Sequence, residues 1–265
     1  MDAGQLLREL SEDVVASVHT KLKGGEGAQV VARRSRDLTL GLDDAAESAL
    51  ERGLVSRGLC ARVVSEERKE RVVGVGEPGF TLVFDPVDGS ANAVRGLGQW
   101  VTAIAYSPLA RDARYPDFTH AAVRTAGGEL YRAQRGAGAF QDDKRLRCAD
   151  AEFPGKPMFS VYLSDARELP AGLASLIRQA KLRAFGSVAL DLCYVAAGYL
   201  DGIADVRDLL SAWDVMAAAL VLEEAGGVLT GRRVEKVSWA AGERGLSMVG
   251  ARTTELHARL LGTLL

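Results

Sequence analysis

The sequence predicts a mixed α/β protein whose two subdomains share one hydrophobic core. Three observations support this fold class: an amphipathic segment opens the chain, short β-branched runs fill most of the first half, and strand-like and helix-like segments alternate after about residue 158. No repeat, low-complexity tract or long linker separates the parts. We therefore expect a single domain over residues 1–265, with an α+β subdomain at about 1–150, an α/β subdomain at about 151–265 and a seam near 145–157.

The first half is expected to contain two helices and then a sheet. Apolar residues at helical spacing before Gly24-Gly25 predict a helix with one core-facing side (Leu6, Leu7, Leu10, Val14, Val18 and Leu22). A second helix is expected from about Asp43 to Leu54. Runs rich in β-branched and aromatic residues then predict strands: ARVVSEE (61–67), RVVGVG (71–76), TLVFD (81–85), WVTAIAY (100–106), HAAVRT (120–125) and ELYRAQ (129–134).

The second half alternates between the two kinds of element. Strands are expected at MFSVYL (158–163), KLRAFG (181–186), GIADV (202–206) and GLSMVGA (245–251). Helices are expected at Ala171 to Gln179, Ser187 to Leu200, Ala212 to Glu224 and Thr253 to Leu264. Such alternation is typical of a layered α/β arrangement.

Composition excludes several classes of function. With 33 basic and 35 acidic residues the formal charge is −2, which gives no basic surplus for nucleic acid or anionic lipid. Three widely separated cysteines (Cys60, Cys148 and Cys193) fit neither a disulfide framework nor a zinc spacing. The amphipathic, acid-containing start is unlike a signal peptide, and the longest apolar stretch is far shorter than the roughly 20 residues that span a bilayer. We expect a cytoplasmic protein without nucleic-acid or membrane partners.

Some apparent motifs are better interpreted as ordinary structure. Gly74, Gly76 and Gly79 match G-x-G-x-x-G, but Pro78 and a strand-like run follow where a dinucleotide fold needs a helix, so a turn between strands is expected. His19, His120 and His257 are isolated and support no zinc site or histidine base. The run from Arg68 to Arg71 is interpreted as a solvated turn.

The segment TLVFDPVDGSAN (81–92) carries the most information about chemistry. An apolar run leads directly into Asp85, and Pro86 and Gly89 then turn the chain, so Asp85 and Asp88 should project into one small volume. Clustered carboxylates repel unless a cation compensates them, and an all-oxygen ligand set suits Mg²⁺. The alternative is an acidic surface turn, which the preceding core-like strand disfavours.

Two further features extend this pattern. Ser90, Ala91 and Asn92 can open a helical turn, whose free backbone N–H groups suit phosphate. Asp214 begins a helix of small apolar residues, where its position alone favours a simple N-cap or first-turn acid. Glu66 and Glu67 at the end of ARVVSEE have the same ambiguity. A predicted Mg²⁺ site beside backbone N–H groups that can bind phosphate indicates phosphoryl-transfer chemistry.

These residues resemble the inositol monophosphatase superfamily of Mg²⁺-dependent, lithium-sensitive-type sugar phosphatases. The matching segments are SEE (65–67), DPVDGSAN (85–92), WDVMAAALVLEEAGG (213–227), DLTLGLD (37–43) and RAFGSVALDLCYVAAGYLDG (183–202). They occur in the family's order and cover most of the chain. The resemblance implies a layered α-β-α-β-α sandwich with two subdomains.

The resemblance also implies a two-metal site. It makes Glu66, Asp85 and the backbone carbonyl of Val87 ligands of one Mg²⁺, and Asp85, Asp88 and Asp214 ligands of a second. Two such ions can stabilise both the entering and the leaving oxygen of an in-line displacement. A third ion is left open, because Leu40 replaces the family's Thr and only Arg33 and Arg34 lie near the position of an upstream Lys.

Other residues are assigned to the water and the substrate by the same resemblance. Asp43 and Ser90 would hold and polarise the attacking water, with Glu66 as a further catalytic residue. The substrate would contact Asp88, Gly89, Ser90, Gly186, Ser187, Val188, Arg207 and Asp214, with Arg207 near the leaving group. SEE replaces the family's G-E-E, Ser90 replaces the commoner Thr, and Ala218 replaces a Gly, but no ligand group is lost.

The function implied is hydrolysis of inositol monophosphate or a similar polyol phosphate, by a chain whose relatives are commonly homodimers. Fructose-1,6-bisphosphatase activity, alone or as a second activity, is the main alternative, because DVR (205–207) resembles members that act on both substrates. A 3′,5′-bisphosphate nucleotidase and a noncatalytic regulatory relative are the remaining alternatives.

Overall fold

The computed structural model describes residues 2–33, 38–150 and 154–264. Its helices and strands, in chain order, are α1 Ala3–Lys23, β1 Val30–Arg33, β2 Leu38–Leu40, α2 Gly41–Ser56, β3 Ala61–Ser65, β4 Lys69–Val73, β5 Thr81–Asp88, α3 Ser90–Val94, β6 Val101–Ser107, β7 His120–Thr125, β8 Leu130–Gln134, β9 Gly138–Gln141, β10 Lys144–Arg145, β11 Met158–Tyr162, α4 Leu173–Gln179, β12 Lys181–Arg183, α5 Val188–Ala196, β13 Gly202–Ser211, α6 Ala212–Glu224, β14 Val228–Gly231, β15 Arg244–Ala251 and α7 Thr254–Leu264. Two short 3₁₀ turns lie at Tyr115–Asp117 and Cys148–Asp150.

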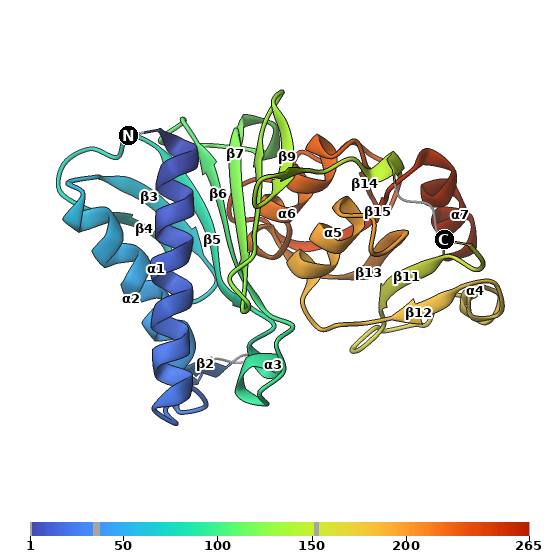
Figure 1. Ribbon diagram of the computed structural model, residues 1–265, viewed down its shortest axis with the longest axis horizontal. Coiled ribbons are helices and arrows are strands. Elements are labelled where there is room, and N and C mark those ends of the chain that lie inside the picture. Colours follow the sequence, from blue (N-terminus) through green and yellow to red (C-terminus); the bar gives the residue numbers. More distant parts are fainter. Residues whose placement is uncertain (1, 34–37, 151–153, 265) are drawn as a thin grey trace.

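Two sheets form the framework of the molecule. One has eight strands in the order β10-β9-β8-β7-β6-β5-β3-β4, and the other has five in the order β12-β11-β13-β15-β14. Helices α1 and α2 cover the outer face of the eight-stranded sheet, α5 and α6 lie between the sheets, and α4 and α7 cover the outer face of the five-stranded sheet (Figure 1). This α-β-α-β-α layering confirms the predicted fold class.

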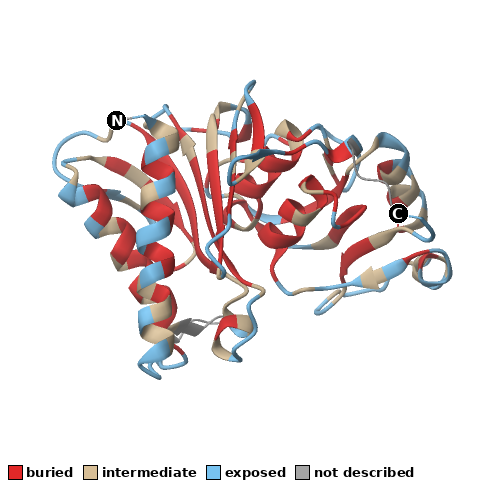
Figure 2. Cartoon of the chain, in the orientation of Figure 1, coloured by how far each residue is buried: buried red, intermediate tan, exposed pale blue. Residues whose placement is uncertain are grey.

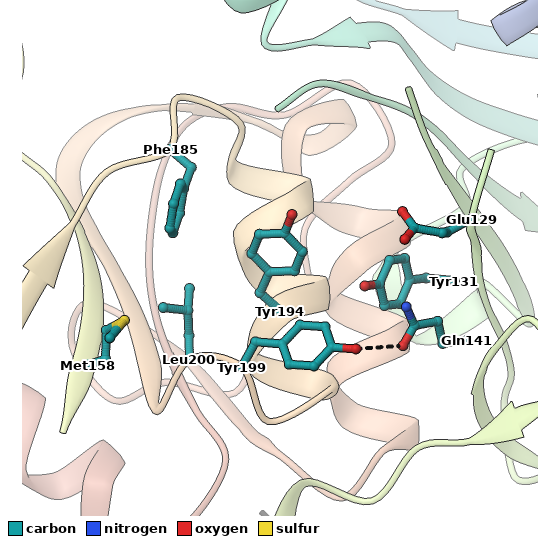
Figure 3. Close-up of a pocket in the computed structure, with 8 residues that line it drawn as sticks. All are labelled: Glu129, Tyr131, Gln141, Met158, Phe185, Tyr194, Tyr199 and Leu200. Atoms are coloured by element: carbon teal, nitrogen blue, oxygen red, sulfur yellow. Dashed lines mark hydrogen bonds between the residues drawn. The ribbon is translucent and has the colours of Figure 1, made fainter. Parts of the chain in front are cut away.

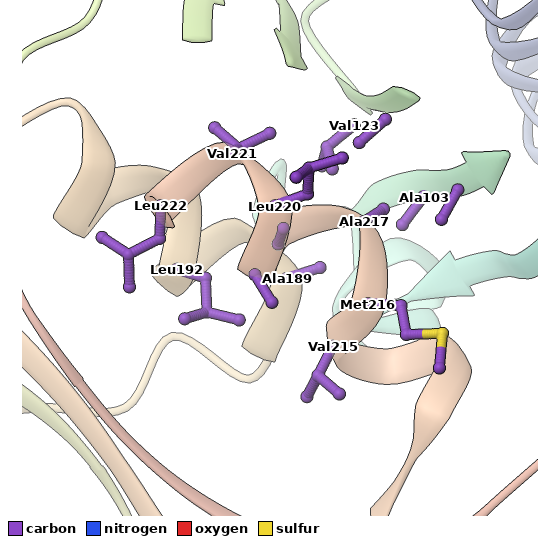
Figure 4. Close-up of a cluster of buried hydrophobic side chains, with 14 of the residues drawn as sticks. Ala103, Val123, Ala189, Leu192, Val215, Met216, Ala217, Leu220, Val221 and Leu222 are labelled. Carbon is purple, nitrogen blue, oxygen red and sulfur yellow. The ribbon is translucent and has the colours of Figure 1, made fainter. Parts of the chain in front are cut away.

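The middle layer is the most deeply buried part of the chain (Figure 2). The small residues of α6, among them Ala217, Ala218 and Ala219, let this helix pack closely between both sheets. Figure 4 shows this packing through labelled side chains of α5, α6, β6 and β7 (Ala103, Val123, Ala189, Leu192, Val215, Met216, Ala217, Leu220, Val221 and Leu222). One continuous core therefore joins the two sheets, while the boundary between subdomains stays a prediction.

Most predicted elements are found, with shifted ends. The helix expected over 187–200 stops at Ala196, because Gly198 adopts a left-handed backbone (φ +78°) that ends it. The strand expected over 202–206 continues to Ser211, and β1, β2, β9, β10 and β14 were not predicted. The Gly74–Gly79 segment joins β4 to β5 as expected. No helix in the described ranges is both long and apolar enough to cross a membrane.

Candidate functional site

The C-terminal end of β5, an interior strand of the eight-stranded sheet, carries two acids close together. Asp85 pairs in register with Ala103 of β6, and a bulge then separates it from Asp88, which pairs with Val101. The hydroxyl of Thr102 donates a hydrogen bond of 2.8 Å to the carbonyl of Pro86 and so fixes the bulge. The bulge removes the strict alternation of a strand, so both acids can face the middle layer.

Asp88 is held by the start of helix α5. Its Oδ2 accepts hydrogen bonds of 2.7 Å from the Ser187 hydroxyl and from the Ala189 backbone N–H. Ser187 is also the N-cap of α5, because its Oγ accepts from the N–H of Leu190. The contact joins the end of β5 to the start of α5 and brings the predicted residues Gly186, Ser187 and Val188 next to Asp88.

Two further predicted acids lie in the first turns of helices. Asp214 is the third residue of α6, and its Oδ2 accepts a 2.7 Å hydrogen bond from the Ser211 N–H. Asp43 has the same place in α2, where its Oδ2 accepts a 3.0 Å bond from the Leu40 N–H. Asp214 is therefore a first-turn acid, as one of the two interpretations predicted. Each of these two carboxylates still has a second oxygen that can bind another partner.

The pKa values show that these acids act on one another. Burial raises the pKa of Asp85 well above its ordinary value, and the charges of Glu66, Asp88, Asp214 and Asp43 raise it further. The pKa of Glu66 is raised well above its ordinary value by burial first and then by Asp214 and other acids. We call Asp43, Glu66, Asp85, Asp88 and Asp214 the acid cluster.

Burial likewise raises the pKa values of the other three members of the acid cluster to about 7. In Asp88 the hydrogen bonds from Ser187 and Ala189 oppose the effect of burial. In Asp214 the hydrogen bond from Ser211 and the charge of Arg244 lower the pKa and so oppose the effect of burial. In Asp43 the hydrogen bond from Leu40 opposes it in the same way. In the part of the chain that the structure describes, no Lys, Arg or His forms an ion pair with Asp43, Asp85, Asp88 or Asp214.

The donor set of the acid cluster fits a hard divalent cation. Asp85 is 1% exposed, and its Oδ1 is buried with no hydrogen-bond partner in the described structure. A buried carboxylate oxygen without a donor is costly unless a cation meets it. Carboxylate oxygens, with the nearby carbonyl of Val87, suit Mg²⁺. No three His, Cys, Asp or Glu side chains of the described residues already surround a common coordination point, so the ligand assignments stay predictions.

A tight loop connects β5 to α3 beside the acid cluster. Gly89 has φ +92°, and a Cβ there would lie 2.8 Å from the carbonyl oxygen of Gln99, so only glycine fits. Asn92 donates from Nδ2 to the carbonyls of Gln99 and Phe185, at 2.7 and 2.6 Å. Sequence reasoning placed Asn92 in a helical turn but predicted no contact for its side chain. Asn92 ties the loop that carries Gly89 and Ser90 to the segment that carries Gly186.

Arg207 lies near the acid cluster but is already engaged. Its Nε and Nη2 donate to the two carboxylate oxygens of Asp205 at 2.9 and 2.5 Å, and its Nη1 donates to the carbonyl of Ser164 at 2.7 Å. Its guanidinium also lies 5.3 Å from the ring centre of Tyr162. Its predicted contact with a leaving group remains a prediction.

The interpretation of Arg68 to Arg71 as a solvated turn is wrong for both arginines. Arg71 pairs with Glu47 and Glu51 at 2.5 and 2.7 Å, and Arg68 pairs with Glu51 and Asp44 at 2.7 Å each. The acids come from α2, about 20 positions earlier, so no local pattern showed the pairing. We call Asp44, Glu47, Glu51, Arg68 and Arg71 the paired cluster.

Sequence reasoning also assigned no role to Arg244. Arg244 begins β15, and its guanidinium carbon lies 4.7 Å from the ring centre of Trp213, the neighbour of Asp214. The register that brings Arg244 opposite Ser211 of β13 cannot be read from the chain. Of the two cations near the position of the family's Lys, Arg33 ends β1 and Arg34 lies outside the described residues.

A separate pocket of about 270 Å³ lies between the two sheets (Figure 3). Its lining is mostly aromatic and apolar (Glu129, Tyr131, Gln141, Met158, Phe185, Tyr194, Tyr199 and Leu200). It contains none of the acid cluster, and the hydrogen bond between Tyr199 and Gln141 closes one side of it. We place the candidate site at the acid cluster because five carboxylates converge there, several with raised pKa values, and four of them lack an ion-pair partner in the described structure.

Comparison with known proteins gives an independent result. The sequence model described as the inositol monophosphatase family matches residues 2–264. A protein of Methanothermobacter thermautotrophicus named fructose-1,6-bisphosphatase/inositol-1-monophosphatase is 30% identical, over 96% of this chain and 94% of its own. A protein of the same name from Thermococcus kodakarensis is 34% identical, over 85% of this chain and 81% of its own.

A solved structure shows the same fold. The crystal structure of an inositol monophosphatase–fructose 1,6-bisphosphatase superposes with a TM-score of 0.83, at 24% identity, over 100% of both chains. Fold and site thus define a layered α-β-α-β-α protein with a carboxylate-rich centre in its middle layer. The chain belongs to the inositol monophosphatase family, whose members are phosphomonoesterases and generally depend on Mg²⁺.

Proposed function

We propose that this chain is a Mg²⁺-dependent phosphomonoesterase that hydrolyses inositol monophosphate or a similar polyol phosphate. The observation that carries the proposal is the acid cluster, whose buried carboxylates raise one another's pKa and include an Asp85 oxygen without a donor. Such a cluster is destabilising by itself, so its presence favours a role that needs cations.

The proposed ligands divide between two ions. Glu66, Asp85 and the Val87 carbonyl would hold one, and Asp85, Asp88 and Asp214 would hold the other. When bound, a pair of Mg²⁺ ions lowers the pKa of water and stabilises the charge on the entering and leaving oxygens. Asp85 would serve both ions, which agrees with its position among the other acids.

The chain's own groups would position water and phosphate. Asp43 would accept a hydrogen bond or a proton from the attacking water, since its pKa of about 7 lets it do so near neutral pH. The Ser90 hydroxyl would orient the same water, and the N–H groups of Gly89 and Ser90 would hold nonbridging phosphate oxygens. As the bond from the water oxygen to phosphorus forms, the bond to the ester oxygen breaks, and the alcohol leaves with a proton from solvent.

The leaving alcohol would lie toward the middle layer. Gly186, Ser187 and Val188 are placed there by the bonds from Ser187 to Asp88 and from Asn92 to Phe185. Gly186 has φ +81°, and a Cβ on it would lie 3.1 Å from Asn92 Nδ2. This close packing supports a fixed wall for the polyol beside the phosphate.

A substrate panel tests the proposal. Phosphate release from inositol 1-phosphate, fructose 1,6-bisphosphate and adenosine 3′,5′-bisphosphate is measured with Mg²⁺ and with EDTA, for the wild type and for Asp88→Asn. We expect hydrolysis of the polyol phosphate that both EDTA and the substitution abolish. Turnover that survives either treatment would contradict the metal-dependent mechanism.

Fructose-1,6-bisphosphatase activity is the second candidate. It is supported by the names of the two archaeal relatives and by the match of Asp205, Val206 and Arg207 to members with both activities. The panel distinguishes it, as it does the 3′,5′-bisphosphate nucleotidase alternative, by the substrate with the highest kcat/KM.

A noncatalytic relative and the oligomeric state are tested separately. A protein that hydrolyses no sugar phosphate in Mg²⁺ but binds a macromolecular partner would support the noncatalytic alternative. A homodimer is proposed from the family resemblance, and light scattering after gel filtration should give twice the mass of the chain.

A further inference from the structure

Arg244 differs from the arginines around it because its donors are free. In the described structure its guanidinium makes no hydrogen bond and no ion pair, and its contact is with the ring of Trp213 at 4.7 Å. A guanidinium has five N–H donors in a planar fork that matches phosphate oxygens. A ring beneath the guanidinium limits its motion while leaving the edge of the fork available.

The backbone around Arg244 fixes it beside the acid cluster. Arg244 lies opposite Ser211 in the register of β13 and β15, and the N–H of Ala212 donates a 2.9 Å bond to the carbonyl of Glu243. Ser211 is the N-cap of α6, and Asp214 lies in its first turn. The Arg244 charge reaches that carboxylate, since it opposes the effect of burial on the pKa of Asp214.

Arg207 cannot easily fill the same role. Three of its nitrogens already donate to Asp205 and Ser164, and its side chain is only 12% exposed. If Arg207 turned away from Asp205 to bind a phosphate, the buried Asp205 carboxylate would lose its compensating cation. The cation with free donors on the Asp214 side of the cluster is therefore Arg244, within the described part of the chain.

We propose that Arg244 binds a second phosphate group of the substrate, on the leaving-group side of the site, and so adds affinity for sugar bisphosphates, the second candidate substrates. The inference rests on the proposed function, because it takes Asp214, one of the predicted substrate contacts, to face the leaving sugar. A group attached to the leaving sugar would then pass Asp214 and meet the guanidinium above Trp213. Recognition by two parallel N–H···O bonds would give Arg244 a selective effect on bisphosphates.

The test uses the full chain with three substitutions. Arg244→Gln removes the charge, Arg244→Lys keeps it without the fork, and Arg132→Gln is the matched control. Arg132 lies on β8, and its guanidinium carbon is 4.4 Å from the ring centre of Phe140, so the control removes a similar contact away from the acid cluster. KM and kcat are measured for fructose 1,6-bisphosphate and inositol 1-phosphate in Mg²⁺.

A binding measurement without turnover accompanies the kinetics. The Kd of fructose 6-phosphate, which keeps the second phosphate, is measured by calorimetry beside that of inorganic phosphate. We expect Arg244→Gln to raise the KM for the bisphosphate and the Kd of fructose 6-phosphate by about tenfold, as the loss of one charge-assisted contact would. Inositol 1-phosphate and inorganic phosphate should change by less than about twofold, Arg244→Lys should restore part of the loss, and Arg132→Gln should match the wild type.

The outcomes separate the two proposals. An unchanged Kd of fructose 6-phosphate in Arg244→Gln would overturn the role of Arg244, even with full hydrolysis by the wild type. An equal loss for both substrates would overturn it too, because it would indicate a general electrostatic or structural effect. Failure of the wild type to hydrolyse any substrate would overturn the proposed function.

Discussion

Two groups of acids both include residues of helix α2 and have opposite surroundings. Asp43 and Asp44 are neighbours in α2, yet Asp43 faces the acid cluster while Asp44 pairs with Arg68 at 2.7 Å. In the paired cluster, the fully buried Glu47 is matched by Arg71. In the acid cluster, burial and mutual repulsion raise the pKa values instead.

The difference shows how one scaffold can treat buried carboxylates in two ways. Acids that meet arginines are permanently neutralised, and their contribution is to join α2 to β3 and β4. The four aspartates of the acid cluster have no ion-pair partner in the described structure, and they store an unfavourable electrostatic energy that a divalent cation can relieve. Pairing partners, more than burial, therefore distinguish a structural acid from a candidate ligand in this protein.

The largest effect should come from the centre of the acid cluster. Asp85→Asn should lower kcat/KM for the preferred substrate by on the order of 10³ or more, because it removes a ligand that both proposed ions share. The same change should raise the melting temperature in EDTA, since one of the repelling charges is gone. Steady-state kinetics and thermal melts check both effects.

The matched control for this substitution is Asp44→Asn in the paired cluster. It makes the same chemical change, one residue from Asp43, on a side chain that is 48% exposed. Its kcat/KM should stay within about twofold of the wild type. If Asp85→Asn also stayed within tenfold, the contrast between the two clusters would have no functional meaning.

The next largest effect concerns stability of the paired cluster. Arg71→Met leaves the Glu47 carboxylate, which is 0% exposed, without its main cation. Breaking a buried pair by removing one partner costs about 3 kcal/mol in the free energy of unfolding, as urea titration would measure. The double variant Arg71→Met with Glu47→Leu should recover most of this loss, and an equally unstable double variant would argue against the charge explanation.

These contrasts also show what the sequence could predict. The mixed α/β class was predictable because amphipathic spacing and β-branched runs carry it, whereas the α-β-α-β-α layering was implied by the family resemblance. The DPVDGSAN motif located Asp85 and Asp88 in advance. The partners of Arg68 and Arg71 were not predictable, because α2 and β4 meet only through tertiary packing. The place of Arg244 depends on the register of β13 and β15, which no local pattern encodes.

A third prediction uses pH. The pKa values of Asp43, Asp88 and Asp214, about 7, lie above the ordinary value of 3.8, so the folded state binds more protons than the unfolded state between these values. Stability of the metal-free protein should therefore fall as pH rises from about 5.5 to 8, by about 5 °C or more in melting temperature.

Magnesium isolates the contribution of the acids in this experiment. Burial lowers the pKa values of His120 and His257 from their ordinary value of 6.5. Below pH 6.5 these two groups therefore make the protein more stable as pH rises, which is opposite to the effect of the acids. The two histidines are not proposed ligands, so Mg²⁺ should leave their effect intact while it removes most of the loss at pH 8. Equal pH dependence with and without Mg²⁺ would mean that the acid cluster does not bind the ion.

The smallest effect should come from a residue that supports the acid cluster. Ser187→Ala removes the donor to Asp88 and the N-cap of α5, and should cost about 1 kcal/mol in unfolding free energy. It should also raise the pKa of Asp88, because the lost hydrogen bond lowers it. Ser175→Ala on the surface of α4 is the control, and an equal effect of the two substitutions would deny Ser187 this role.

The most direct measurement is a crystal structure of the protein with Mn²⁺ in place of Mg²⁺, in which anomalous scattering locates the ions. We predict two peaks within the acid cluster, both bonded to Asp85, one shared with Glu66 and the other with Asp88 and Asp214. Full-occupancy Mn²⁺ only on surface carboxylates, with the acid cluster still bare, would contradict the account.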